Sequence, residues 1–397
     1  MPISLPYRLA QLALCASACF AIPTPGGHLP SLQPNCNDID INLRASAPNK
    51  IFTFNLTKYG TPEATTELLV SLGTAPTNVV NGNYRVAGRF CSPLRDVPER
   101  RQTLQILVHG LTYTKEYWNG PSTQASGPPA TNQSWIYYAA EQGYSVLAVD
   151  RLCNGRSAHS NGNEECQRPL EAAILDKVVQ TARNGTLPGL RTKFNKIIYV
   201  GHSYGSEIGS YIARTNPSVI DQLHLTGYSE NILITSPAVI LRPDLRLASK
   251  TSPSRFSNLD PGYTMETARN VSEKLYYSKA AVDPAVLNYT WATRGTVAIG
   301  ELLTAGGGPA PQYNGDVFVI NGDEDALFCP VDAASAVAIK PGACTATNAT
   351  EDVAHDFPGA RRFGYFNVPG TGHSIGLHKT TSLAIVASHQ FMAETGF

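Results

Sequence analysis

The sequence has no excess of charge of either sign. It contains 31 lysines and arginines and 31 aspartates and glutamates among 397 residues, so the formal net charge at pH 7 is zero. Proteins that bind nucleic acid neutralise its phosphates with a basic surface, and this composition gives no electrostatic case for such a partner. The hydrophobic fraction of 42% is enough for a large buried core, as in a globular enzyme.

Motifs for metal, redox and nucleotide chemistry are also missing. The sequence has no Cys-x-x-Cys pair and no His-Glu-x-x-His motif, which would indicate a zinc site or a redox-active thiol. A run of three glycines, residues 306–308, is followed by neither Gly-Lys-Ser nor Gly-Lys-Thr. We therefore interpret this run as a hinge and not as a phosphate loop, and we expect no metal site and no cofactor.

No apolar run reaches the length of about 20 residues that a membrane-spanning helix requires. The run 9–21 follows Arg8, contains small residues near its end and precedes a proline-rich segment. This pattern is typical of a signal peptide, cleaved after Ala18 or Ala21. A membrane anchor is the alternative, which the short run disfavours. We expect residues 1–21 to be removed and the protein to be secreted, with no transmembrane segment.

Eight cysteines are present, and six of them lie after the predicted signal peptide. An even number of cysteines in a secreted chain favours disulfide bonds, and buried free thiols are the alternative. Of the three pairs that we favour, the last two each close a short loop. These pairs are Cys36–Cys91, Cys153–Cys166 and Cys329–Cys344.

Asparagine sequons occur six times along the chain, and each is a potential N-glycosylation site on the surface of a secreted protein. They begin at Asn55, Asn132, Asn184, Asn270, Asn288 and Asn348. A single sequon has little meaning, but six together support secretion.

The most informative stretch is residues 201–205, with the sequence Gly-His-Ser-Tyr-Gly. The apolar run 196–200 precedes it and a segment of helical composition, residues 206–215, follows it, so the stretch predicts a sharp turn between a strand and a helix. The two glycines allow this turn to tighten while the hydroxyl of Ser203 points outward. The backbone N–H of Tyr204 is then free to donate at the helix N-terminus, where the helix dipole favours negative charge.

Other apolar runs end in turn-forming or polar groups, which is the pattern of a parallel sheet in an α/β fold. The predicted strands of this kind are residues 103–108, 143–149, 316–320 and 362–368. A further strand is predicted at 222–226, and two antiparallel strands, 51–58 and 84–91, lead into the sheet. The run 316–320 ends in an acidic loop, and the run 362–368 ends in a glycine-rich loop that contains His373. A nucleophile loop, an acidic loop and a histidine loop thus each follow a strand of their own.

With this order of loops, residues 50–395 resemble the α/β-hydrolase superfamily, as a secreted serine esterase-like member. The superfamily places a serine, an acid and a histidine in that order along the chain, which maps onto Ser203, a carboxylate in residues 323–325, and His373. The stretch 143–151 also looks like the strand and loop that precede the nucleophile in this superfamily. The resemblance implies a mostly parallel central sheet of the α/β-hydrolase type.

Two aspartates compete for the role of the triad acid. Members of the superfamily commonly place this carboxylate three residues beyond the glycine that ends the strand, and counting from Gly322 gives Asp325. Asp323 follows the glycine directly, and we expect it to stabilise the turn through backbone hydrogen bonds. The predicted acid is therefore Asp325.

His373 is the predicted base, because it alone of nine histidines lies in a glycine-rich loop after the last strand. A histidine titrates near neutrality and can take and return the proton of Ser203. His378 is the alternative base, although we expect it on the following helix. His109 and His202 adjoin the site, and we expect them to serve the geometry of the backbone turns.

The pair His109-Gly110 looks like the oxyanion loop of the superfamily. The predicted oxyanion donors are therefore the backbone N–H groups of Leu111 and Tyr204. Lipases and esterases of the triple-glycine type carry His-Gly-Gly-Gly at this point, whereas Leu111 and Thr112 follow Gly110 here. This departure argues against the triple-glycine subfamilies and leaves the substrate class open.

The interval 231–313 is too long for a simple connection between two strands. It contains several prolines with helical stretches between them and ends near the three glycines, so we predict a cap inserted over the active site between the nucleophile and acid strands. The expected organisation is a signal peptide at 1–21, an irregular extension at 22–50, a hydrolase core at 51–230 and 314–397, and the cap at 231–313.

These features together predict a secreted serine hydrolase that cleaves a small-molecule carboxylic ester or lactone through an acyl-enzyme on Ser203. The enzymatic alternatives are a lactonase or natural-product tailoring hydrolase and an aminopeptidase of the same fold. A binding protein that has lost catalysis is an alternative of a different class. A serine at the elbow argues against epoxide hydrolase and dehalogenase chemistry, which the superfamily performs through an aspartyl ester.

Overall fold

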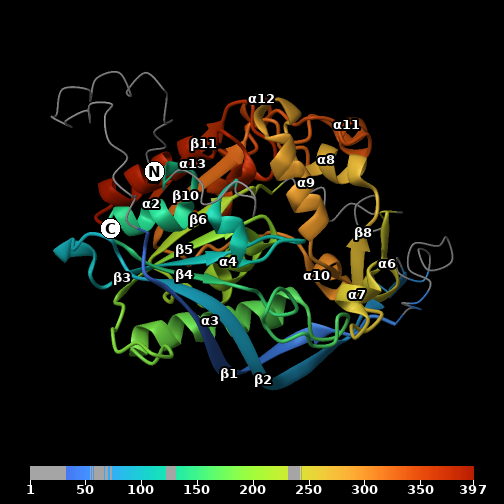
Figure 1. The fold of residues 1–397 in the computed structure, drawn as a ribbon, viewed down its shortest axis with the longest axis horizontal. Coiled ribbons are helices and arrows are strands. Elements are labelled where there is room, and N and C mark those ends of the chain that lie inside the picture. The colour runs from blue at the N-terminus through green and yellow to red at the C-terminus, as the bar shows by residue number, and fades with distance from the viewer. Residues whose placement is uncertain are drawn as a thin grey trace.

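An eight-stranded sheet forms the centre of the molecule, in the order β1-β2-β4-β3-β5-β6-β10-β11 (Figure 1). The computed structural model describes residues 33–397 apart from residues 54, 56, 58–66, 68–69, 72–73, 122–130, 231–241 and 243. The strands of this sheet are β1 (Cys36–Lys50), β2 (Thr77–Cys91), β3 (Thr103–Val108), β4 (Ser145–Val149), β5 (Lys196–His202), β6 (Gln222–Thr226), β10 (Asp316–Gly322) and β11 (Arg362–Val368). The predicted signal peptide lies outside the described residues.

The six strands from β4 to β11 in this order run parallel, and helices cover both faces. On one face lie α3 (Arg168–Asn184) and α4 (Tyr204–Thr215), and on the other lie α2 (Trp135–Glu141) and α13 (Thr381–Glu394) (Figure 1). The central strands are buried almost throughout, because a sheet covered on both sides needs apolar residues in both directions. The predicted fold class is confirmed: a mostly parallel central sheet with flanking helices.

The start of the sheet differs from the prediction. Residues 36–50 are not irregular but form β1, which pairs antiparallel with β2 over its whole length. Inward residues alternate with polar ones along β1, from Ile39 to Ala47, and this period of two is the signal that predicts a strand. Residues 51–53, expected in a strand, follow its end. The prediction relied on the abundance of Pro, Asn and Gly in residues 22–50, whereas the alternation decides the structure.

Among the residues that the structure describes, three disulfide bonds join the pairs that the sequence favours. Cys36 and Cys91 are partners in the register of β1 and β2, so this bond closes the end of the first hairpin. The bonds Cys153–Cys166 and Cys329–Cys344 each close a loop beyond the carboxyl end of a sheet strand.

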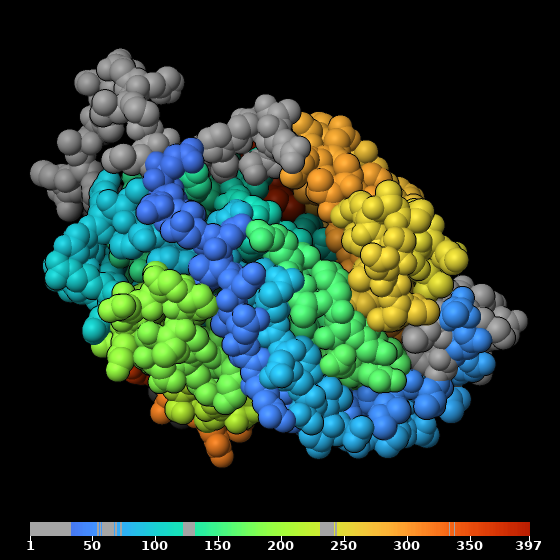
Figure 2. Space-filling model, turned by 60° about the horizontal axis from the view of Figure 1, so that its bottom comes forward, coloured from blue at the N-terminus to red at the C-terminus, as the bar shows by residue number. Residues whose placement is uncertain are grey.

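Between β6 and β10, the chain leaves the central sheet and builds a second, three-stranded antiparallel sheet in the order β7-β8-β9. We refer to residues 244–313 as the inserted segment. Its elements are β7 (Leu245–Leu247), α6 (Ala248–Thr251), α7 (Pro253–Phe256), β8 (Tyr263–Glu266), α8 (Arg269–Tyr276), η7 (Lys279–Ala281), α9 (Pro284–Thr293), β9 (Val297–Ala298) and α10 (Ile299–Thr304). Figure 2 shows much of this segment, in yellow and orange, as a lobe beside the face that carries the blue β1 and the green α3.

Short helices complete the described structure. They are η3 (Pro98–Arg100), η4 (Lys115–Asn119), η5 (Thr131–Gln133), α11 (Ala333–Val337), α12 (Cys344–Thr347), η8 (Asp352–Asp356) and η9 (Ile375–Leu377). None of the described helices has the length and apolar character needed to cross a membrane. The asparagines of all six sequons are exposed at the surface.

Candidate active site

Ser203 occupies the sharp turn between β5 and α4. Its backbone has φ 54° and ψ −121°, a conformation that a residue with a side chain rarely adopts and that costs on the order of 1–3 kcal/mol. The turn is held in place because Ser203 N donates to Thr226 O at 2.8 Å, and Ser203 O accepts from the N–H of Ser206 at 2.7 Å. The strand, turn and helix predicted from the sequence are thus present, with the strain that such an elbow requires.

Glycines surround this turn because no side chain would fit. A Cβ on Gly201 would lie 2.6 Å from Gly205 O, and one on Gly205 would lie 2.2 Å from Val108 O. A Cβ on Gly110 would lie 2.9 Å from Ser203 Cβ. The loop that follows β3 therefore passes directly against the serine, and only glycine permits this approach.

His373 follows β11, and its ring lies between the acid loop and the serine loop. Its Nδ1 is 2.7 Å from Asp325 Oδ2, and both side chains are buried. The second carboxylate oxygen, Asp325 Oδ1, accepts from the N–H groups of Leu327 at 2.8 Å and Phe328 at 3.0 Å. The Phe328 ring also stacks on His373 at 5.3 Å. These contacts fix the imidazole with Nδ1–H toward the carboxylate, which leaves Nε2 to accept a proton.

Asp323 has a different environment. Its Oδ1 accepts from Thr345 N at 2.9 Å, and no hydrogen bond joins it to His373 among the described residues. Its backbone oxygen accepts from Cys344 N at 3.0 Å, while Asp325 O accepts from Cys329 N at 3.1 Å. The disulfide between these two cysteines therefore lies directly behind the acid loop. The geometry favours Asp325 over Asp323 as the partner of the histidine.

Three other histidines, His378, His109 and His202, were also considered from the sequence. Each of their ring nitrogens is either hydrogen-bonded or buried. His378 accepts at Nε2 from Ser278 N and Gly372 N and faces Ser374 O with Nδ1. Burial lowers the pKa of His378 to about 4. It follows η9 and precedes α13, so its expected place on the last helix is wrong.

His109 and His202 also serve the backbone. His109 Nε2 accepts from Arg151 N, and its Nδ1 faces Gly110 O; burial and the Arg151 cation lower the pKa of His109 to about 3. His202 Nδ1 lies 3.1 Å from Thr226 Oγ1, and burial and then the neighbouring His373 lower its pKa well below the usual range. Both rings are neutral, and His373 is the histidine that faces the serine cavity.

The two predicted oxyanion donors lie on either side of Ser203. Tyr204 begins α4, where its N–H has no partner within the helix. Leu111 follows Gly110 in the loop packed against the serine. Within the described part of the chain, neither N–H donates a hydrogen bond, so both remain available to an oxyanion.

A small cavity of about 30 Å³ brings these groups together. Ser203 and His373 line it with Leu111 and Tyr113, and the remaining wall comes mainly from the inserted segment. Its other lining residues are Arg242, Leu245, Tyr276, Val297, Leu302 and Leu327.

The described residues contain no group of three or more His, Cys, Asp or Glu side chains arranged to hold a metal ion. The groups that the arrangement brings together are a serine hydroxyl, an imidazole oriented by a carboxylate, and two backbone N–H donors. This combination suits acyl transfer.

The model of a protein family described as the alpha/beta hydrolase family matches residues 105–383, which include all of these groups. The chain belongs to the alpha/beta hydrolase family. No curated protein matches the sequence significantly.

Solved structures show how far this likeness extends. The hydrolase is similar to the enol-lactonase from Burkholderia xenovorans, with 13% identity, a TM-score of 0.51, and coverage of 78% of this chain and 97% of the lactonase. A thermophilic esterase from Thermogutta terrifontis has 14% identity and a TM-score of 0.47, with 88% and 99% of the two chains covered. A hydrolase from Pseudomonas aeruginosa has 16% identity and a TM-score of 0.46, with 78% and 94% covered. At this identity the lactonase supports the shared fold alone.

Sequence reasoning missed two residues of this hydrolase that contact the site. Arg242 lines the cavity, where Asp244 and Glu266 balance its charge. Arg151 is fully buried beside the oxyanion loop. Arg151 could have been identified from the sequence, because a charged pair, Asp150-Arg151, directly follows an apolar strand.

Proposed function

We propose that this hydrolase is a secreted serine hydrolase that cleaves carboxylic esters through an acyl-enzyme on Ser203. The observation that carries the proposal is the buried pair of Asp325 and His373, joined at 2.7 Å, in which His373 lines the same cavity as Ser203. In this proposal Ser203 is the nucleophile, His373 the general base and Asp325 the residue that orients the base. A hydroxyl is a poor nucleophile at neutral pH, and such an arrangement activates it.

The reaction follows from these positions. Ser203 Oγ attacks the ester carbonyl while His373 Nε2 takes its proton, and the resulting oxyanion is stabilised by the N–H groups of Leu111 and Tyr204. The C–O bond then breaks, and the alcohol leaves with the proton from His373. A water molecule, deprotonated by His373, attacks the acyl-enzyme, and the acid is released from Ser203.

We also propose that the region 231–313, including the inserted segment, acts as a cap over the serine. Gly295 N donates to Thr112 O at 2.7 Å, which joins the segment to the oxyanion loop. A pocket for a small-molecule ligand holds about 300–1,000 Å³, whereas the cavity is about 30 Å³. A substrate therefore needs the cap to move. Gly306 and Gly308, with φ 143° and 139°, end the segment in conformations that favour glycine and suit the hinge.

The walls of the cavity suit a small ester or lactone. Leucine, valine and tyrosine side chains form most of them, and the cation among the described lining residues, Arg242, is already paired. Three disulfides and six exposed sequon asparagines support a secreted, glycosylated protein.

A substrate panel tests the proposal. Purified protein is assayed on p-nitrophenyl esters of graded acyl length, a lactone and an aminoacyl amide, with the Ser203→Ala variant as the control for each. Ester hydrolysis that depends on Ser203 supports the esterase. A higher kcat/KM on the lactone or the amide would instead make the protein a lactonase or an aminopeptidase, and no turnover of any substrate would support an inactive binding protein.

A further inference from the structure

Arg151 is a fully buried cation just after β4, and its guanidinium is held at all three nitrogens. Nη1 pairs with Glu171 Oε2 at 2.6 Å and with Glu301 Oε1 at 2.5 Å. Nε and Nη2 donate to the backbone oxygens of His109 at 3.0 Å and Gly110 at 3.3 Å. We refer to these five residues as the Arg151 cluster.

The cluster controls the direction of one proposed oxyanion donor. The oxygen of Gly110 and the N–H of Leu111 belong to the same peptide group, which is planar and trans, so the two point in opposite directions. Two donors hold this oxygen: Arg151 Nη2 and, at 2.8 Å, the Nδ1 of His109. Because the oxygen is fixed on one side, the N–H of Leu111 is aimed on the other side. The guanidinium also lies 4.8 Å from the ring of Tyr204, which carries the second donor.

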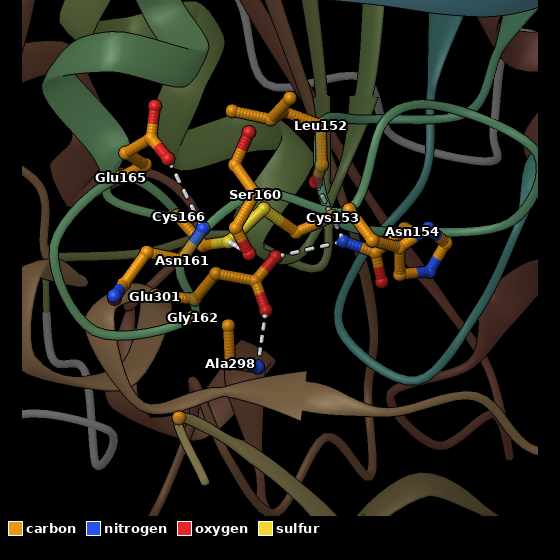
Figure 3. Close-up of a disulfide and its surroundings, with 12 residues drawn as sticks. Leu152, Cys153, Asn154, Ser160, Asn161, Gly162, Glu165, Cys166, Ala298 and Glu301 are labelled. Carbon is orange, nitrogen blue, oxygen red and sulfur yellow. Dashed lines mark hydrogen bonds between the residues drawn. A yellow bond between two sulfur atoms is a disulfide. The ribbon is translucent and has the colours of Figure 1, made fainter. Parts of the chain in front are cut away.

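Glu301 brings the inserted segment into the cluster. It lies in α10, and its side chain is fully buried. Oε1 accepts from Asn154 Nδ2 at 2.9 Å, and Oε2 accepts from Ala298 N at 2.8 Å (Figure 3). Oε1 also accepts from Arg151 Nη1. Both bonds of Oε1 therefore depend on α10 lying against the loop after β4, whereas the bond of Oε2 lies within the inserted segment.

That contact is close. Gly300 N donates to Gly162 O at 2.9 Å, and a Cβ on Gly300 would lie 2.5 Å from Cys166 O. The disulfide between Cys153 and Cys166 closes the loop on which α10 rests (Figure 3). The two sides of the contact thus meet backbone to backbone.

The charges of the Arg151 cluster favour a coupling between the docking of α10 and the geometry of the oxyanion loop. One cation faces two buried carboxylates, and burial raises the pKa of Glu171 to about 8. The charge of Glu301 contributes to this rise, whereas Arg151 opposes it. Without Glu301, the pKa of Glu171 therefore falls and its carboxylate can balance Arg151, so no uncompensated cation is left in the interior. The guanidinium then loses one of its two anchors on Nη1 while its carbonyl partners stay the same.

We propose that Arg151 is a positioning residue of the oxyanion hole, and that Glu301 makes this positioning depend on the docking of the inserted segment. The inference rests on the proposed function. With α10 docked, both carboxylates hold the guanidinium, and the N–H of Leu111 points into the cavity. With α10 displaced, as substrate entry requires, the guanidinium keeps only Glu171 as an anchor and holds this peptide less firmly. Full catalytic competence then returns only when the segment closes over a bound substrate.

The Glu301→Gln variant tests this coupling, because it keeps the size of the side chain and removes its charge. Removal of an oxyanion donor costs about 10²–10³ in kcat, so a misdirected donor should lower kcat by about 10–10² with KM changed less than about threefold. The Ki of a trifluoromethyl ketone, which Ser203 converts to a tetrahedral oxyanion, should rise by the same factor as kcat/KM falls. Partial unfolding would lower kcat without changing this Ki.

Glu207→Gln is the matched control. Glu207 is also a buried carboxylate bonded to the inserted segment, since its Oε2 accepts from Gly306 N at 2.6 Å, but it makes no bond to Arg151. Its kcat and Ki should stay within about twofold of the wild type. If Glu301→Gln leaves both values unchanged, or if Glu207→Gln changes them equally, the inference is overturned. Absence of ester hydrolysis and of Ser203 labelling in the wild type would instead contradict the proposed function.

Discussion

Asp325 Oδ2 lies 2.7 Å from His373 Nδ1, and neither side chain reaches the surface. The remaining oxygen of Asp325 is held by two backbone N–H groups, so the carboxylate cannot turn away from the ring. A carboxylate in this position keeps the imidazole in the tautomer that can accept a proton at Nε2 and stabilises the imidazolium that forms. Asp323, two residues earlier, bonds the backbone of Thr345.

The two aspartates should therefore respond differently to substitution. We expect Asp325→Asn to keep the fold and to lower kcat by about 10⁴ near neutral pH, because the amide favours the wrong tautomer of His373. Asp323→Asn should change kcat far less and lower the stability slightly. The measurement is kcat for both variants on the same ester, normalised to the folded fraction. The opposite ranking would move the acid to Asp323.

Ser203→Ala should lower kcat by about 10⁴ or more while the protein stays folded, because no acyl-enzyme can form. Alanine keeps the Cβ at this strained backbone position, so the variant removes the hydroxyl alone. A fluorophosphonate should label the wild type on Ser203 and should leave the variant unlabelled, as peptide mass mapping would show. Labelling at another residue, or full activity of the variant, would contradict the mechanism.

Removal of the Cys329–Cys344 bond should affect both stability and catalysis. The bond closes a loop with a sequence separation of 15 residues, and in the chain-entropy model such a bond contributes roughly 3 kcal/mol. The double variant Cys329→Ala/Cys344→Ala should lose about this free energy of unfolding in urea, and its kcat should fall because both cysteines bond the backbone of the acid loop. Peptide mapping without reduction checks the pairing. A free thiol at either position would rule out this role.

Much of the fold could be predicted because the parallel strands are continuous apolar runs that end in recognisable loops. β3, β5 and β10 were identifiable for this reason, and the elbow at Ser203 followed from glycines whose necessity the structure explains. β1 was not predicted, because the abundance of Pro, Asn and Gly in residues 22–50 suggested an irregular segment, although inward and polar residues alternate along the strand. In β1 the inward positions include alanines, whose small side chains give a weak apolar signal.

The residues that surround and hold the candidate active site could not be predicted, because they are far apart in the chain. Glu301 and Arg151 are 150 residues apart and meet only through the folding of the inserted segment. The order of serine, acid and histidine along the chain identified Ser203, the acid loop and His373. This order contains no information on which side chains line the cavity. Arg242 is such a residue, since its role depends on a segment outside the central sheet.

The last prediction concerns His378, which braces the histidine loop in its neutral form. Its Nε2 accepts from Ser278 N at 3.0 Å and from Gly372 N at 3.2 Å, and a protonated ring could accept neither bond. Burial lowers its pKa from 6.5 to about 4. Between these two values the unfolded chain binds a proton that the folded protein excludes, so the free energy of unfolding falls as the pH falls through this window.

The His378→Gln variant isolates this contribution, because its amide oxygen can accept the same hydrogen bonds but does not titrate. A shift of one pKa unit corresponds to about 1.4 kcal/mol, so the wild type should lose roughly 3 kcal/mol more than the variant between pH 6.5 and pH 4. Urea unfolding of both proteins at several pH values measures the difference. His109 and His389, whose pKa values burial also lowers, titrate in both proteins, so their effects cancel. Parallel stability curves for the two proteins would show that His378 does not carry this dependence.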